Sequence, residues 1–265
     1  MKKSLITLAV LCSMAISSLT YAQDASPHKL SLGLITCHKE YKEHHPSPDS
    51  EYLSGMFSGL TGGYDYINAD DIYGGVSFRA VKGNNARSGF VTGTWAYADS
   101  PTSTLYDIEG RLGYTVRCMF KDSRLVTPYL GCGYYRWAVK GDKDQDPNGK
   151  DIISWVYASA GIRIDNLYAI NDTTTLGANV ALKYMLNGKL NDKENSLKYD
   201  LGKRIHFDVE APITVKIDND TIEGISYTPF YEYKRTGDSN IVAGGQQMAF
   251  ADHAVGIKIM VLLSL

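Results

Sequence analysis

Charged side chains that could line a water-filled path recur at alternate positions in this sequence. Between Tyr106 and Arg117, for example, Asp107, Glu109 and Arg111 alternate with apolar or small residues. Such a charged face could select ions along a pore, or its members could pair with one another as a salt-bridged filling. The charges that we expect on this face include Glu109, Arg111, Arg117, Arg136, Arg163, Lys183, Glu210 and Lys258.

A second candidate for chemistry is a partial calcium loop. Asp144, Asp146 and Asn148, followed by Gly149, reproduce the first six positions of the D-x-D-x-N-G pattern. Their alternate oxygens could converge on a hard cation, and the glycine permits the sharp turn. However, the twelfth position, which should supply a bidentate carboxylate, is Trp155. We therefore expect an ordinary polar loop, with calcium binding as the alternative, and no other cofactor.

Histidine and serine residues show no spacing that indicates catalysis. His38, His44 and His45 fall in or near one polar segment, without the Cys/His spacing of a zinc site. His253 and Ser239 have no pattern that would pair a base with a nucleophile. We therefore expect that the protein is not an enzyme, and keep a lipid-modifying enzyme as a lower alternative.

The alternation itself indicates β-strands, because successive strand side chains point to opposite faces. Eleven segments qualify, and bacterial single-chain barrels have an even number of strands. Merging 72–98 into one strand gives ten. Eight or twelve remain open, since the N-terminal pair could be peripheral and 241–247 could add a strand. The candidate strands are 30–41, 52–67, 72–81, 89–98, 105–119, 125–140, 152–165, 173–186, 205–217, 222–234 and 254–265.

The apolar face of these strands predicts contact with lipid. Many candidates reach about 12 residues, against about 5–6 for strands of soluble proteins. We predict an all-β protein, a transmembrane antiparallel up-and-down β-barrel with an apolar outside and a polar lumen. The short turns at 120–124, 166–172 and 218–220 would be periplasmic, and the long loops at 141–151, 187–203 and 236–252 extracellular. The rival is a soluble lipocalin-like barrel or sandwich, whose apolar face points inward.

The N-terminal segment and the composition predict export. Residues 1–22 read as a signal peptide, with Lys2 and Lys3 before a short apolar stretch and a cleavage site after Ala22. Residues 23–265 would then form the barrel domain. No later run is long enough for a transmembrane helix, and a net charge of −2 gives no nucleic-acid footprint. The three cysteines after the signal peptide, Cys37, Cys118 and Cys132, cannot form a closed disulfide framework, so we expect small apolar fillers.

Short glycine-rich motifs add a resemblance. Ile108–Tyr114 and Thr127–Tyr134, together with Leu32–Leu34, resemble small bacterial outer-membrane β-barrels of the OmpA type and related surface barrels. This resemblance implies a Gram-negative outer membrane, with its lipid and the barrel-assembly machinery as partners. Members usually end on an aromatic residue that this machinery reads, whereas this chain ends Leu263-Ser264-Leu265. The departure bears on recognition during assembly and not on the strand pattern.

Together these observations predict a monomeric outer-membrane barrel with a mostly plugged polar lumen. We expect a structural or surface-interaction role that the extracellular loops carry, with a partner that the sequence does not identify. The alternative is a narrow porin-like channel for ions or small solutes. As a check on the faces, Leu182→Arg should impair insertion, and Lys183→Gln should be milder.

Overall fold

A computed structural model describes residues 28–43, 51–91, 94–98, 102–117, 125–140, 150–192, 197–219, 221–242, 245–246 and 249–265. The predicted signal peptide, the cysteine at 118 and the calcium-loop candidates Asp144, Asp146 and Asn148 lie outside these residues. Among the described residues, no helix is long and apolar enough to cross a membrane.

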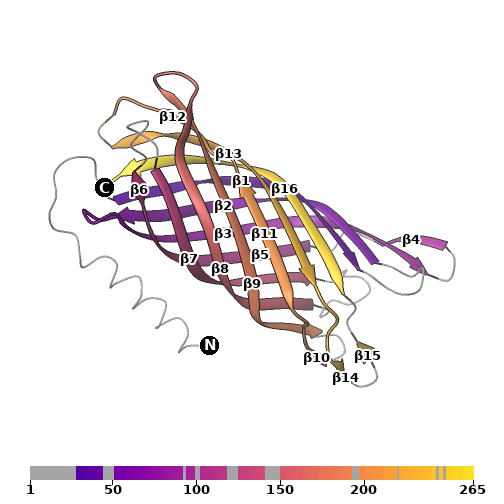
Figure 1. The fold of residues 1–265 in the computed structure, drawn as a ribbon. Coiled ribbons are helices and arrows are strands. Elements are labelled where there is room, and N and C mark those ends of the chain that lie inside the picture. Colours follow the sequence, from indigo (N-terminus) through magenta and orange to yellow (C-terminus); the bar gives the residue numbers. More distant parts are fainter. Residues whose placement is uncertain are drawn as a thin grey trace.

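The described chain closes into an antiparallel barrel (Figure 1). Ten strands form the wall if β5 with β6, and β11 with β12, each count as one strand. The wall runs β1, β2, β3, β5, β7, β8, β9, β11, β13, β16, and β16 pairs with β1 to close it. These elements are β1 (His28–Glu43), β2 (Glu51–Ile67), β3 (Ile72–Val91), β5 (Thr102–Tyr114), β6 (Val116–Arg117), β7 (Leu125–Lys140), β8 (Lys150–Ala169), β9 (Thr174–Asp192), β11 (Arg204–Glu210), β12 (Ile213–Lys216), β13 (Ile222–Thr236) and β16 (Phe250–Ser264).

The remaining strands extend the wall at one end or lie beyond it. The predicted single strand 72–98 is wrong in one respect: Thr94 pairs with Val91, so β4 (Thr94–Ala98) already runs back along β3 toward β5. β10 (Leu197–Asp200) pairs with the far end of β9. β14 (Ile241–Val242) and β15 (Gly245–Gln246) form a small separate hairpin, so 241–247 adds no strand to the wall.

The barrel has one apolar outer face and one polar inner face, as the alternation predicts. On β9, for example, Val180 and Leu182 are exposed, whereas Asn179 and Lys183 are buried. The same parity recurs on β16, where Val255, Ile257, Ile259 and Val261 point outward. An exposed apolar belt around a closed sheet suits hydrocarbon and not water, so the soluble alternatives are excluded.

Short turns identify one rim. Asn68, Asn171 and Asn219 each start a turn in which the side-chain oxygen accepts backbone N–H bonds from residues two to four positions later. Asparagine stabilises such turns because its side chain replaces a backbone acceptor. β1 begins and β16 ends at the same rim. Since short turns are periplasmic in barrels of this class, we call this the periplasmic rim and the opposite one extracellular.

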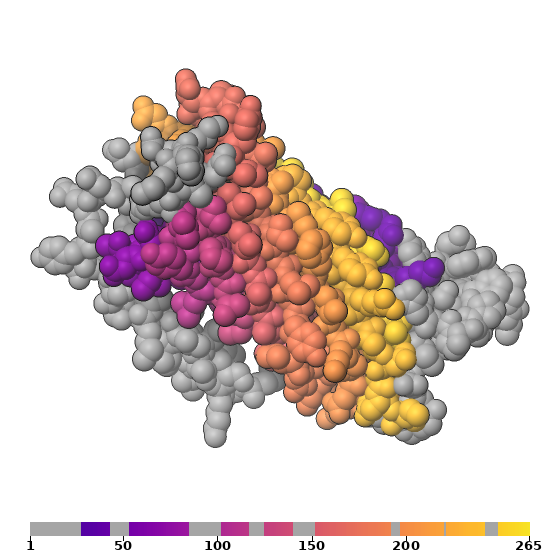
Figure 2. All heavy atoms as spheres, viewed as in Figure 1, coloured from indigo at the N-terminus to yellow at the C-terminus, as the bar shows by residue number. Residues whose placement is uncertain are grey.

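The lumen holds three successive layers. Near the extracellular rim lies a group of buried apolar and aromatic side chains, here called the aromatic layer. Below it, buried charges form the lumen network, and a cavity, here called the vestibule, opens toward the periplasmic rim. The members of the aromatic layer include Tyr41, Phe57, Tyr135, Trp137, Trp155, Tyr157 and Phe250. The outer surface that encloses these layers is continuous across the strands in view (Figure 2).

Candidate functional site

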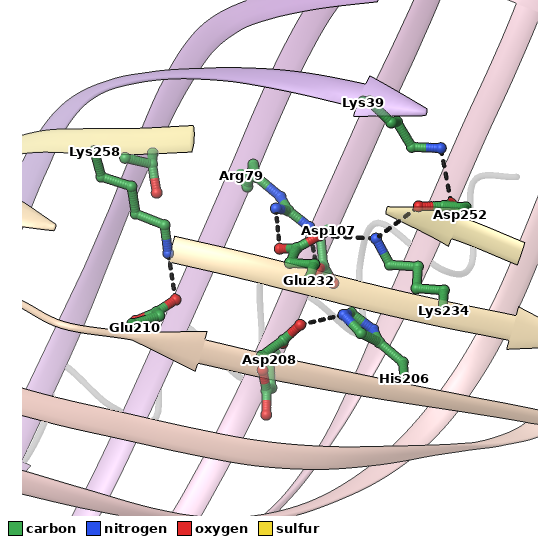
Figure 3. A network of polar contacts seen from close by, with 12 residues as sticks. Lys39, Arg79, Asp107, His206, Asp208, Glu210, Glu232, Lys234, Asp252 and Lys258 are labelled. Atoms are coloured by element: carbon green, nitrogen blue, oxygen red, sulfur yellow. Dashed lines mark hydrogen bonds and ion pairs between the residues drawn. The ribbon is translucent and has the colours of Figure 1, made fainter. Parts of the chain in front are cut away.

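The lumen network begins with a contact that crosses the barrel (Figure 3). Arg79 of β3 contacts Glu232 of β13, and its Nη2 lies 3.2 Å from Asp107 Oδ2 of β5. All three side chains are at most a tenth exposed. Alternation on each strand points them inward, and closure of the barrel brings strands that are far apart in sequence to the same depth.

Lys183 joins two walls of the lumen. Its Nζ lies 2.8 Å from Asp208 Oδ2 on β11 and 3.2 Å from Glu109 Oε2 on β5. Asp107 Oδ2 is 3.9 Å away. Ser159 completes the shell of Glu109 by donating to its Oε1 at 2.7 Å. A buried ammonium with three carboxylates has the partners that its removal from water requires.

A second group of pairs leads toward the extracellular rim. Lys234 Nζ lies 2.8 Å from Glu232 Oε2 and 4.0 Å from Asp252 Oδ1. Lys39 donates to Asp252 Oδ2 at 2.8 Å and lies 3.6 Å from the Trp137 ring centre. The charged network therefore continues into the aromatic layer without a gap (Figure 3).

His206, Asp208 and Glu232 offer the donor set of a metal site, which the sequence interpretation missed. One ligand atom from each lies within 4.8 Å of the others, and all three residues are buried. Asp208 already pairs with Lys183, and Glu232 pairs with Arg79 and Lys234. Three adjacent cations would repel a metal ion, so this group fits the salt-bridged filling better than a metal centre. The H-x-D alternation at 206–208 was the only signal for it in the sequence.

The vestibule is the open part of the lumen. It has a volume of about 790 Å³, extends from the periplasmic rim and ends on Glu109, Lys183 and other members of the lumen network. Ion pairs line its walls: Arg163 Nη1 lies 2.6 Å from Asp65 Oδ2, and Lys258 Nζ lies 2.6 Å from Glu210 Oε1. Cavities of this size hold small molecules in other proteins.

The aromatic layer closes the lumen above the network. Tyr135 and Trp155 stack with ring centres 3.7 Å apart, and Tyr41 lies 5.5 Å from Trp137 and 4.7 Å from Phe250. Aromatic pairs at these spacings pack with little free volume. Cys37 is buried in the same layer, as a small apolar filler should be, whereas Cys132 is exposed on the outside.

Six of the eight predicted lumen charges lie in the lumen, namely Glu109, Arg111, Arg163, Lys183, Glu210 and Lys258. The prediction for Arg136 is wrong. Its register partner on β5 is Tyr106, which is exposed on the outer face, so Arg136 also lies on that face. Arg117 lies in β6, and its side chain is outside the description.

Comparison with solved structures agrees with this architecture. The outer-membrane protease OmpT from Escherichia coli matches with a TM-score of 0.51 and 11% identity, over 92% of this chain and 99% of that one. The transport unit of the autotransporter AIDA-I from Escherichia coli gives a TM-score of 0.42 and 12% identity, over 95% of this chain and 96% of that one. OprG from Pseudomonas aeruginosa gives 0.40 and 10%, over 91% and 96%.

No family model matches the sequence, and no curated protein matches it. The likeness to OmpT therefore concerns the fold. The chain has the architecture of bacterial outer-membrane β-barrels.

Proposed function

We propose that this protein is an outer-membrane barrel of structural or surface-interaction type whose lumen conducts neither ions nor solutes. One observation carries the proposal: Arg79 and Glu232 touch across the lumen, directly beneath the aromatic layer. A contact between distant walls leaves no solute path at that depth. Because loops on a rigid scaffold usually carry binding, we assign the interaction to the segments at the extracellular rim.

The same contacts argue against a catalytic lumen. A general base must reach its substrate, yet Asp208, Glu232 and His206 are buried and already paired with one another or with cations. We therefore propose no enzymatic role for this group. Lipid would surround the barrel, and a single chain is enough to complete the wall.

Conductance in planar bilayers tests the proposal. The refolded full chain should insert, as judged by heat-modifiable migration on gels, and give no steady current. A variant that combines Arg79→Ala and Glu232→Ala with Tyr135→Ala and Trp155→Ala should conduct, because it removes both the cross-lumen pair and the stacked rings. As a matched control, Leu182→Ala with Tyr184→Ala changes only the outer face and should stay silent. Steady channels from the unaltered barrel would contradict the proposal.

A narrow channel is the second candidate, and the vestibule favours it. The cavity already reaches Lys183 from the periplasmic rim, so only the network and the aromatic layer separate it from the other end. If the unaltered barrel conducts, the charges at the inner end of the vestibule become its selectivity residues. Changing Glu109 to Gln should then shift the preference between cations and anions.

A further inference from the structure

Arg204 is a buried cation without a counter-ion among the described residues. It starts β11 inside the aromatic layer and is 2% exposed, and its three side-chain nitrogens have no hydrogen-bond partner. The Trp155 and Phe250 ring centres lie 4.1 and 4.4 Å from its Cζ. Ring faces stabilise a guanidinium through its π surface, but they leave its N–H groups without acceptors.

Charge counting isolates the same residue. Every acid of the described lumen network has an ion pair, with Arg79, Arg111, Lys183, Lys234 or Lys39 as its partner. Arg204 has none in the part of the chain that the structure describes. The buried cations are Lys39, Arg79, Arg111, Lys183, Arg204 and Lys234, against the acids Asp107, Glu109, Asp208, Glu232 and Asp252. Six cations against five acids leave one positive charge uncompensated, if His206 is neutral.

Other unpaired donors lie beside this charge. Thr236 is the register partner of Arg204, and its buried Oγ1 has no hydrogen-bond partner. The hydroxyl of Tyr135, whose ring stacks on Trp155, and Nε1 of Trp137 are also unpaired. The unpaired acceptor in this layer is Asp252 Oδ1, and it already lies 4.0 Å from the Lys234 ammonium. The excess in the layer is therefore one of donors and of positive charge.

We propose that the aromatic layer binds one small monovalent anion, a halide or a carboxylate group, at the Arg204 guanidinium. Such an anion supplies the single missing charge, and it accepts several hydrogen bonds at once from guanidinium and hydroxyl donors. Arg204 follows Lys203, which is exposed at the extracellular rim, so the site lies next to the outside solution. The anion would hold β11 against β8 and β16, the strands that carry the two flanking rings.

Bromide titration tests this site through its own tryptophans. Two of the three tryptophans of the chain, Trp137 and Trp155, lie in the aromatic layer, and bromide quenches indole fluorescence on contact. The refolded full chain in zwitterionic detergent is titrated with bromide at constant ionic strength, with sulfate as the balancing salt. We expect saturable quenching and a thermal midpoint that rises with bromide. A parallel titration with formate, read by the thermal midpoint and by competition with bromide, shows whether the site prefers a halide or a carboxylate.

Two variants locate the effect. Arg204→Met should weaken saturable quenching by about tenfold or more, because the charge-assisted bonds are lost. Lys203→Met removes the neighbouring exposed charge and should titrate like the unaltered chain. Equal saturable quenching in Arg204→Met and the unaltered chain would overturn the proposal. If Arg204→Met fails to refold, the unaltered chain decides: a thermal midpoint that responds equally to bromide, formate and sulfate would overturn it as well.

Discussion

Arg79 of β3 contacts Glu232 of β13, although β2, β1 and β16 separate these strands in the wall. The contact therefore spans the lumen and does not run along it. Lys183 makes a second link, from β9 to Glu109 of β5, past β8 and β7. Two cross-links at one depth make the network part of the scaffold, because the barrel cannot widen there without separating buried charges.

Removing the Lys183 charge should destabilise the barrel strongly. Lys183→Met leaves Asp208, Glu109 and Asp107 without their shared cation. Breaking a buried ion pair from one side costs about 3–5 kcal/mol, so the free energy of unfolding in urea should fall by that order. Lys183→Gln should also be costly, which revises the milder effect that the sequence alone predicts.

The control for this change is Lys216→Met. Lys216 also lines the vestibule, but it is exposed and has no ion pair among the described residues. Its loss should change the unfolding free energy by less than about 0.5 kcal/mol. Equal losses at both positions would show that burial in the network contributes nothing.

A positive charge on the outer belt should impair insertion. Leu182 is 54% exposed near the middle of the outward face of β9. Leu182→Arg should reduce the stability of the barrel in lipid by about 2–4 kcal/mol, the cost of arginine near the bilayer midplane. Asn187→Arg is a matched control on the same strand near the extracellular rim, where the cost falls to about 0–1 kcal/mol. Refolding yield into vesicles over a urea series measures both, and similar yields would contradict the position of the membrane.

Gly133 should resist a methyl group that Gly110 accepts. A Cβ at Gly133 would overlap the Tyr157 ring, which lies between the aromatic layer and Asp107. A Cβ at Gly110, on the outer face, would meet only Cys132 O at 4.0 Å. We expect Gly133→Ala to cost about 1–3 kcal/mol by overpacking. Gly110→Ala should be neutral or stabilising by up to about 1 kcal/mol. Thermal midpoints of the two variants check the difference, and the reverse order would refute the packing around Tyr157.

The alternation made most of the fold predictable, because one rule sets the parity of a whole strand. Lys183 and Leu182 fall on their correct faces for this reason. The rule failed for Arg136, where Tyr134, Tyr135 and Trp137 make both faces apolar. The lumen is itself aromatic at that depth, so hydrophobicity no longer distinguishes inside from outside.

The contacts of the network could not be predicted in the same way. Which carboxylate meets Arg79 depends on the stagger between strands once the barrel closes, and no local pattern encodes it. A bulge also shifts the pairing of β8 and β9 near Val156, so positions beyond it change partners. Lys39 and Asp252 were missed for the same reason, since they meet only because β16 closes on β1.

Sided labelling of single cysteines tests the central claim, that the lumen is a vestibule closed by the layers above it. In a cysteine-free background, Ser226→Cys places a thiol in the vestibule, and Ile153→Cys places one in the aromatic layer. A membrane-impermeant thiol reagent applied to oriented proteoliposomes should label the first only from the periplasmic side and the second from neither side. Labelling of Ser226→Cys from both sides, at comparable rates, would show an open path and contradict the account.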